Sequence, residues 1–125
     1  EANMVEKIAR FSLGCILLMF GLNYFLSFLP APEMSREAGV FLNALRNTGY
    51  MFVMIKCFEL TAAVLFLLNR FVPLATILIA PGIFNILMFH LFLDQGGLFM
   101  GVLLSGLLGI IVAHRKDAYA SLLTP

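Results

Sequence analysis

Four long apolar runs, separated by short polar segments, occupy most of this chain of 125 residues. Each run holds close to the roughly 20 apolar residues with which an α-helix crosses the hydrocarbon core of a bilayer. Prolines, an Asn-Arg pair and a pair of glycines mark the connections between the runs. The pattern predicts an all-α membrane protein of one domain (residues 1–125). Its four-transmembrane-helix bundle has spans at about 5–29, 49–68, 73–93 and 98–113.

The segment between spans one and two predicts a short outer amphipathic helix. Ser35 is a good N-cap, because its side-chain oxygen can accept a hydrogen bond from the first helical turn. The apolar residues that follow recur at one-turn spacing: Val40, Phe41, Ala44 and Leu45. Two interpretations of the Ser35–Asn47 segment stay open. Its apolar face lies in the membrane interface, or the segment packs over the mouth of the bundle.

Composition supports a membrane protein, with hydrophobic residues at 62% and charged residues at 12% of the chain. A soluble domain carries about 25% charged residues. The net charge of +1 also excludes the concentrated basic surface that a nucleic-acid partner requires. We therefore expect the lipid bilayer as the main surroundings and no nucleic-acid partner.

The distribution of basic residues predicts the orientation of the spans, because cytoplasmic loops retain Lys and Arg. With four spans, the two termini and the loop between spans two and three share one side of the membrane. That side holds Lys7, Arg10, Arg70, Arg115 and Lys116, whereas the loops on the other side hold only Arg36 and Arg46. The excess predicts a multi-pass protein with both termini in the cytoplasm.

Polar residues inside the apolar spans are the candidates for function, because an ionisable group at mid-bilayer costs about 2.5–3.5 kcal/mol on insertion scales. Lys56 and Glu59 are three residues apart and so share one helix face. By depth, the candidate ligand-binding residues all belong to the outer half: Asn23, Lys56, Glu59, Asn85, His90 and Asp94. In the inner half we expect only flanking basic residues.

Two interpretations of these polar residues stay open. In one, Lys56 and Glu59 neutralise each other and the asparagines form packing contacts between helices. In the other, they line an outward-facing pocket for a polar head group, a quinone ring or a proton. In that pocket Asn23, Glu59, Asn85 and His90 converge.

The geometry of span three refines the pocket hypothesis. Asn85 and His90 are five residues apart, a rotation of about 140° around an ideal helix. We therefore expect Asn85 to face the bundle interior beside Glu59, and His90 to reach toward Asp94 or the Ser35–Asn47 helix. Two neighbouring residues do not form a metal site, and no H-E-x-x-H spacing occurs. Hence we predict no metal, and no catalytic residue can be named.

Small residues recur every four positions in span four, at Gly97, Gly101, Ser105 and Gly109. Such a face lets a neighbouring helix approach closely. We expect it to pack inside the bundle. The alternative is a contact with a larger membrane protein complex or with a second copy of the chain.

Several segments resemble the DoxX-like family of small bacterial membrane proteins. They are Arg10–Gly14, Phe20–Asn23, Glu59 with the Leu-rich half-helix after it, Pro73-Leu-Ala, Ala80–Asp94 and the tail Tyr119–Pro125. Their order and spacing cover essentially the whole chain. The resemblance implies a four-helix bundle in the bacterial inner membrane, with Asn23, Glu59, Asn85 and His90 as the polar residues carried over by position.

For function, the resemblance implies an accessory or partner subunit of a redox system. Some members of the family resemble partners of quinone-linked enzymes, including a thiosulfate-oxidising one. Quinone is therefore the candidate cofactor. A non-catalytic scaffold or assembly subunit and a small-molecule or lipid transporter remain as alternatives. Whether the chain is an enzyme is left open, because the family has no settled mechanism.

Overall fold

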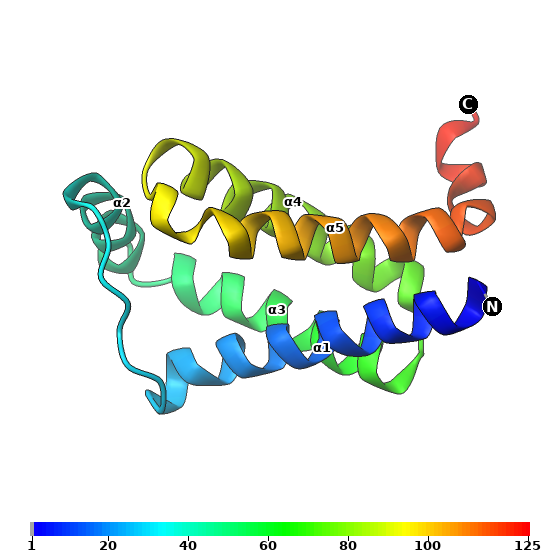
Figure 1. Cartoon of the computed structure of the whole chain (residues 1–125), viewed down its shortest axis with the longest axis horizontal. Helices are drawn as coiled ribbons and strands as arrows, with labels where there is room; N and C mark the ends of the chain where they lie inside the picture. Colours follow the sequence, from blue (N-terminus) through cyan, green and yellow to red (C-terminus); the bar gives the residue numbers. More distant parts are fainter. Residues whose placement is uncertain (1) are drawn as a thin grey trace.

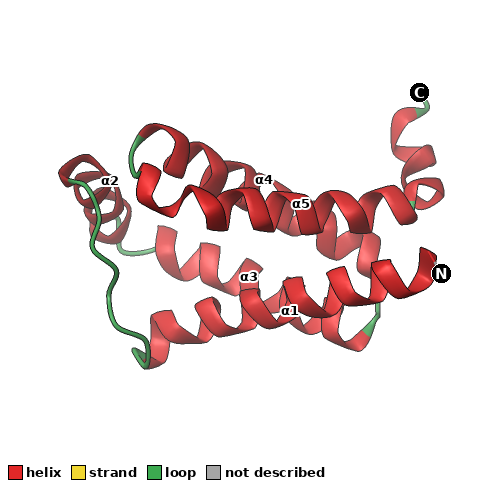
Figure 2. Ribbon diagram, viewed as in Figure 1, coloured by secondary structure: helices red, strands yellow, loops and turns green. Residues whose placement is uncertain are grey.

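A computed structural model describes the backbone of residues 2–125 and the side chains from Met4 onward. Figure 2 shows helices joined by loops, with an extended one between α1 and α2, and the described residues include no strand. The all-α prediction is therefore confirmed. The helices are α1 (Ala2–Leu26), α2 (Arg36–Asn47), α3 (Met51–Leu68), α4 (Val72–Phe92) and α5 (Leu98–His114), with 3-10 turns at η1 (Gln95–Gly97) and η2 (Lys116–Leu123).

The four long helices α1, α3, α4 and α5 form the bundle, and each is long and apolar enough to cross a membrane. Helix α1 packs against α3 and α5, and α4 packs against the same two helices, so the four close into a ring. Figure 1 shows both chain termini at one end of the bundle and α2 at the opposite end. These are called here the terminal end and the α2 end.

The helix boundaries lie within about three residues of those predicted, and backbone geometry explains the differences. Helix α1 ends at Leu26 because Ser27 turns left-handed, with φ of 54°. Asn69 ends α3 in the same conformation, which asparagine tolerates better than most residues. Pro73 lies in the first turn of α4, where its missing N–H costs no hydrogen bond.

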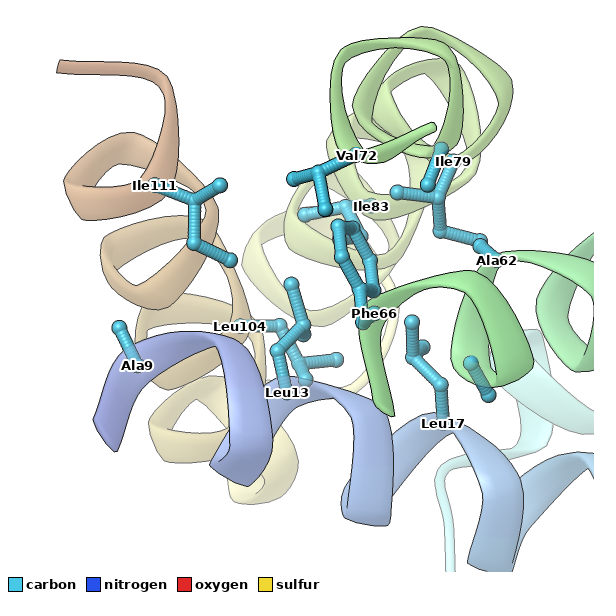
Figure 3. Close-up of a cluster of buried hydrophobic side chains, with 12 residues drawn as sticks. Ala9, Leu13, Leu17, Ala62, Phe66, Val72, Ile79, Ile83, Leu104 and Ile111 are labelled. Carbon is cyan, nitrogen blue, oxygen red and sulfur yellow. The ribbon is translucent and has the colours of Figure 1, made fainter. Parts of the chain in front are cut away.

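The core lies along the centre of the ring. Figure 3 shows the ring of Phe66 in α3 between Leu13 and Leu17 of α1 and Val72 and Ile83 of α4. All five residues are at most 2% exposed to solvent. Other large apolar side chains remain on the outside, such as Phe99 at 75% exposed. A bilayer accommodates helices whose outer side chains are apolar. The chain is therefore a multi-pass membrane protein.

Helix α2 is docked on the α2 end of the bundle. Ser35 caps it, accepting a hydrogen bond from the Ala38 N–H at 3.1 Å, and its hydroxyl donates to the Leu93 carbonyl. The Phe41 ring lies 5.8 Å from that of Phe89. The predicted helix and its cap are confirmed, and these contacts show it packed over the bundle mouth.

Only part of the apolar face of α2 packs on the bundle. Ala38 is buried and Phe41 and Leu45 are half-buried, whereas Val40 and Ala44 are exposed. Val40 and Ala44 therefore lie beside the packed face. The docking bond of Ser35 rotates the helix so that Ala38 turns inward.

Candidate functional site

Lys56 and Glu59 form a buried ion pair inside α3. The Lys56 Nζ lies 3.3 Å from both carboxylate oxygens of Glu59. Glu59 is 5% exposed, and the Lys56 side chain is 16% exposed. The expected pairing of these two residues is therefore present. A charge pair this far inside a span is stable only because each member neutralises the other.

Helix α1 closes one side of this pair. Gly21 packs on α3, where a Cβ added to it would meet Leu60 Cδ2 at 2.7 Å and Glu59 Cβ at 3.8 Å. The missing side chain thus lets α1 approach close to the ion pair. An ammonium group carries three N–H donors. The two contacts with Glu59 leave Lys56 a donor for a further acceptor.

A stack of side chains lies between the ion pair and the α2 end. The rings of Tyr24 and Phe52 are parallel to within 8° with centroids 5.3 Å apart. The Arg46 guanidinium of α2 lies 5.3 Å from the Phe52 centroid. Because Phe52 precedes Lys56 by four residues, the two share one face of α3. Sequence reasoning did not identify this stack, since it joins three different helices.

His90 reaches toward Asp94, as expected. Its Nδ1 lies 3.1 Å from the Asp94 backbone oxygen and 3.9 Å from a carboxylate oxygen. The hydrogen bond is therefore to the backbone, with the carboxylate nearby. A carbonyl only accepts, so Nδ1 donates and Nε2 of the neutral ring is left as an acceptor. The imidazole occupies the space that a side chain at Gly97 would fill.

Asn23 has a local role at the end of α1. Its Oδ1 accepts a hydrogen bond from the Leu29 N–H at 2.7 Å. The Ser27 N–H donates to the Asn23 carbonyl at 2.8 Å. Asn23 thus fixes the chain as it leaves the bundle, and no described contact joins it to Glu59.

Asn85 is exposed on the outer surface of α4, so the expectation that it faces the interior beside Glu59 is wrong. The core face of α4 is defined by Ala75, Ile79 and Ile83. Asn85 follows Ile83 by two residues and is rotated about 200° from it. The helix therefore presents Asn85 toward lipid and a largely apolar face toward the core, with Thr76 as its buried polar residue.

The candidate residues thus separate into groups instead of converging. Two surface hollows are described, and none of the six candidates lines either one. The smaller, about 250 Å³, lies over Arg36, Glu37 and Val40 of α2. The larger, about 430 Å³, lies between α4 and α5. Among the described residues no three His, Cys, Asp or Glu side chains are placed to hold a metal ion.

The small-residue face of α5 divides into a packed half and a half that lines the larger hollow. Gly101 is buried, and a Cβ there would meet Leu87 Cα at 3.1 Å, so this part packs inside the bundle as expected. Ser105 and Gly109 instead line the groove between α4 and α5. The face therefore serves packing near the α2 end and remains open nearer the terminal end.

A second polar network lies near the terminal end, so the expectation of only flanking basic residues there is wrong. Glu6 accepts from Arg10 at 3.5 Å and from Arg115 at 2.8 Å. Arg115 also donates to Asn69 at 2.8 Å, and Arg10 donates to the Phe66 carbonyl at 2.7 Å. The spacing of Glu6 and Arg10 was a usable signal, because residues four apart pair on a helix.

Comparison with protein-family models, curated proteins and solved structures found no match to this chain.

Proposed function

We propose that this protein is an integral-membrane partner subunit of a redox system in the bacterial inner membrane. In this proposal the Lys56–Glu59 pair holds the polar ring of a quinone. The observation that carries the proposal is the pair itself, a charged couple within an apolar span whose lysine is not fully enclosed. Intramembrane ionisable residues commonly mark ligand or proton paths.

The chemistry of the pair suits a quinone carbonyl. Lys56 donates its remaining N–H to the ring oxygen, while Glu59 keeps the ammonium in place and can exchange a proton with it. The Tyr24–Phe52 stack adds aromatic surface one helical turn nearer the α2 end. The redox partner supplies the electrons in this scheme, and this chain positions the ring.

The same proposal places both termini in the cytoplasm. The terminal end carries Lys7, Arg10, Arg70, Arg115 and Lys116, whereas the α2 end carries Arg36 and Arg46. Retention of basic residues on the cytoplasmic side favours this orientation. The Lys56–Glu59 pair and the aromatic stack then open toward the outer face.

A scaffold subunit is the second candidate function. It is favoured by the groove between α4 and α5, where Ser105 and Gly109 leave room for a helix of a larger membrane complex. In that case the Lys56–Glu59 pair is structural. The two functions differ in whether a quinone stays bound to the protein during purification.

The test is purification from the native membrane into nanodiscs, with mass spectrometry of bound quinones, lipids and proteins. The comparison is between the parent chain and the double variant Lys56→Met, Glu59→Leu, which removes both charges at similar volume. A control, Val64→Ala, alters an exposed position of the same helix.

Quinone bound to the parent and to the control, but lost from the double variant, supports the redox role. Equal quinone in all three contradicts a site at Lys56. A stable membrane complex without quinone in any sample favours the scaffold instead.

A further inference from the structure

Asn85 lies in the middle of an exposed apolar stripe along α4. Helix α4 runs Val72–Phe92, so Asn85 is three residues past its centre, about 4.5 Å along the axis. The hydrocarbon core is about 30 Å thick, so this carboxamide faces lipid tails near mid-bilayer. Its exposed neighbours on the same side of the helix are Leu74, Ile77, Pro81 and Phe92.

The Asn85 side chain has no hydrogen-bond partner in the part of the chain that the structure describes. Gln95, by contrast, donates back to the Leu91 carbonyl at 3.3 Å. Hydrocarbon offers no water to satisfy a carboxamide, and leaving one unpaired there is costly. The nearer lipid head groups lie roughly 10 Å away at the interface, beyond the reach of this side chain. The partner must therefore come from another membrane-embedded chain.

The carboxamide is complementary to itself, because it carries both an acceptor oxygen and an NH₂ donor. All copies of a membrane protein insert in the same orientation, so two α4 helices placed about a two-fold axis along the bilayer normal are parallel. Such an axis brings identical residues of the two copies together at the same depth. Two Asn85 side chains can then exchange two hydrogen bonds.

We propose that the Asn85 face of α4 is the contact between two copies of this chain, with the two Asn85 carboxamides bonded at its centre. The flanking side chains of Leu74 and Phe92, 50% and 78% exposed, supply the apolar surface that packs around them. Polar side chains bonding across helices, together with close packing, are what associate helices in lipid.

This contact differs from the small-residue face of α5, part of which is used inside the bundle at Gly101. It is also independent of the proposed quinone site, because Asn85 makes no described contact with Lys56 or Glu59. A monomeric protein that still binds quinone, or a dimer that does not, would separate the two proposals.

The test is cross-linking of the full chain in native membranes with a short bis-maleimide. Cys15 and Cys57 are first replaced by Ala, since both are free thiols. Phe92→Cys then places one thiol on the proposed contact, near the α2 end of α4. Phe99→Cys is the matched control, since Phe99 is 75% exposed near the same end of α5. Each is combined with Asn85→Leu and with Asn85→Gln.

The expected result is a dimer of this chain cross-linked through residue 92 and not through residue 99. Asn85→Leu should weaken the dimer roughly tenfold, since two average interhelical hydrogen bonds amount to about that factor. Asn85→Gln should retain it, because the carboxamide is kept. Equal cross-linking at both positions, a dimer unaffected by Asn85→Leu, or an adduct with a different protein would each overturn the proposal.

Discussion

The side chain of Arg10 crosses from α1 to the end of α3 and donates a hydrogen bond to the Phe66 carbonyl oxygen at 2.7 Å. That carbonyl lies in the last turn of its helix, where it otherwise accepts only the Asn69 N–H at 3.2 Å. A cation near a helix C-terminus also interacts favourably with the helix dipole. Arg10 is 8% exposed, so this bond is made in a sheltered position.

Arg10→Leu should therefore destabilise the bundle by about 2 kcal/mol, the magnitude of a hydrogen bond to a charged group. The substitution leaves the Phe66 carbonyl with the Asn69 N–H alone and Glu6 with Arg115 alone. The measurement is unfolding in mixed detergent micelles. Lys7→Leu, a change at an exposed neighbour, is the control and should shift stability by less than about 0.5 kcal/mol. Equal losses in the two variants would contradict the role given to Arg10.

The Lys56–Glu59 pair should show strong coupling. Removing one member of a buried pair costs about 3–5 kcal/mol, because the remaining charge is left without compensation. Glu59→Gln alone should therefore destabilise more than the double change Lys56→Met, Glu59→Leu. Unfolding of the single and double variants under one set of detergent conditions provides the comparison. If the single change is tolerated as well as the double, the two charges do not depend on each other.

Gly97→Ala should displace the His90 ring. The added methyl would occupy the position of the imidazole, and overpacking of this kind costs about 1–3 kcal/mol. The φ of Gly97 is −101°, which alanine adopts freely, so the effect comes from the ring and not from the backbone. In a His90→Ala background the same substitution should cost much less. If Gly97→Ala costs as much stability without the His90 ring as with it, the clash with the ring is not the cause.

Single cysteines should report the membrane orientation. In a chain without Cys15 and Cys57, Met4→Cys and Asp117→Cys should react with a membrane-impermeant maleimide only from the cytoplasmic side. Val40→Cys on α2, 61% exposed, should react from the opposite side. Labelling of positions 4 and 117 from different sides would overturn the four-span arrangement.

Features set by local sequence were the ones that could be predicted. Span length follows from the apolar runs, and the cap of α2 follows from Ser35 directly before it. The Lys56–Glu59 contact follows from a spacing of three on a helix. Each of these depends on residues within a turn or two of one another.

The orientation of Asn85 could not be predicted, because α4 is apolar on almost every side. Without a polar face, the sequence of a helix does not indicate which side meets its neighbours. Packing of Ile79 and Ile83 into the core decides the rotation and turns Asn85 outward. The bond between Glu6 and Arg115 was missed for a different reason, since it joins residues 109 positions apart.

That long-range bond affects how the protein is made. During synthesis Arg115 leaves the ribosome long after Glu6. Until then, of the two arginines that bond Glu6, only Arg10 is present. The bond from Arg115 to Glu6 can form only after α5 has been synthesised. A chain interrupted before that point lacks the bond that joins the first membrane-spanning helix to the end of the last one.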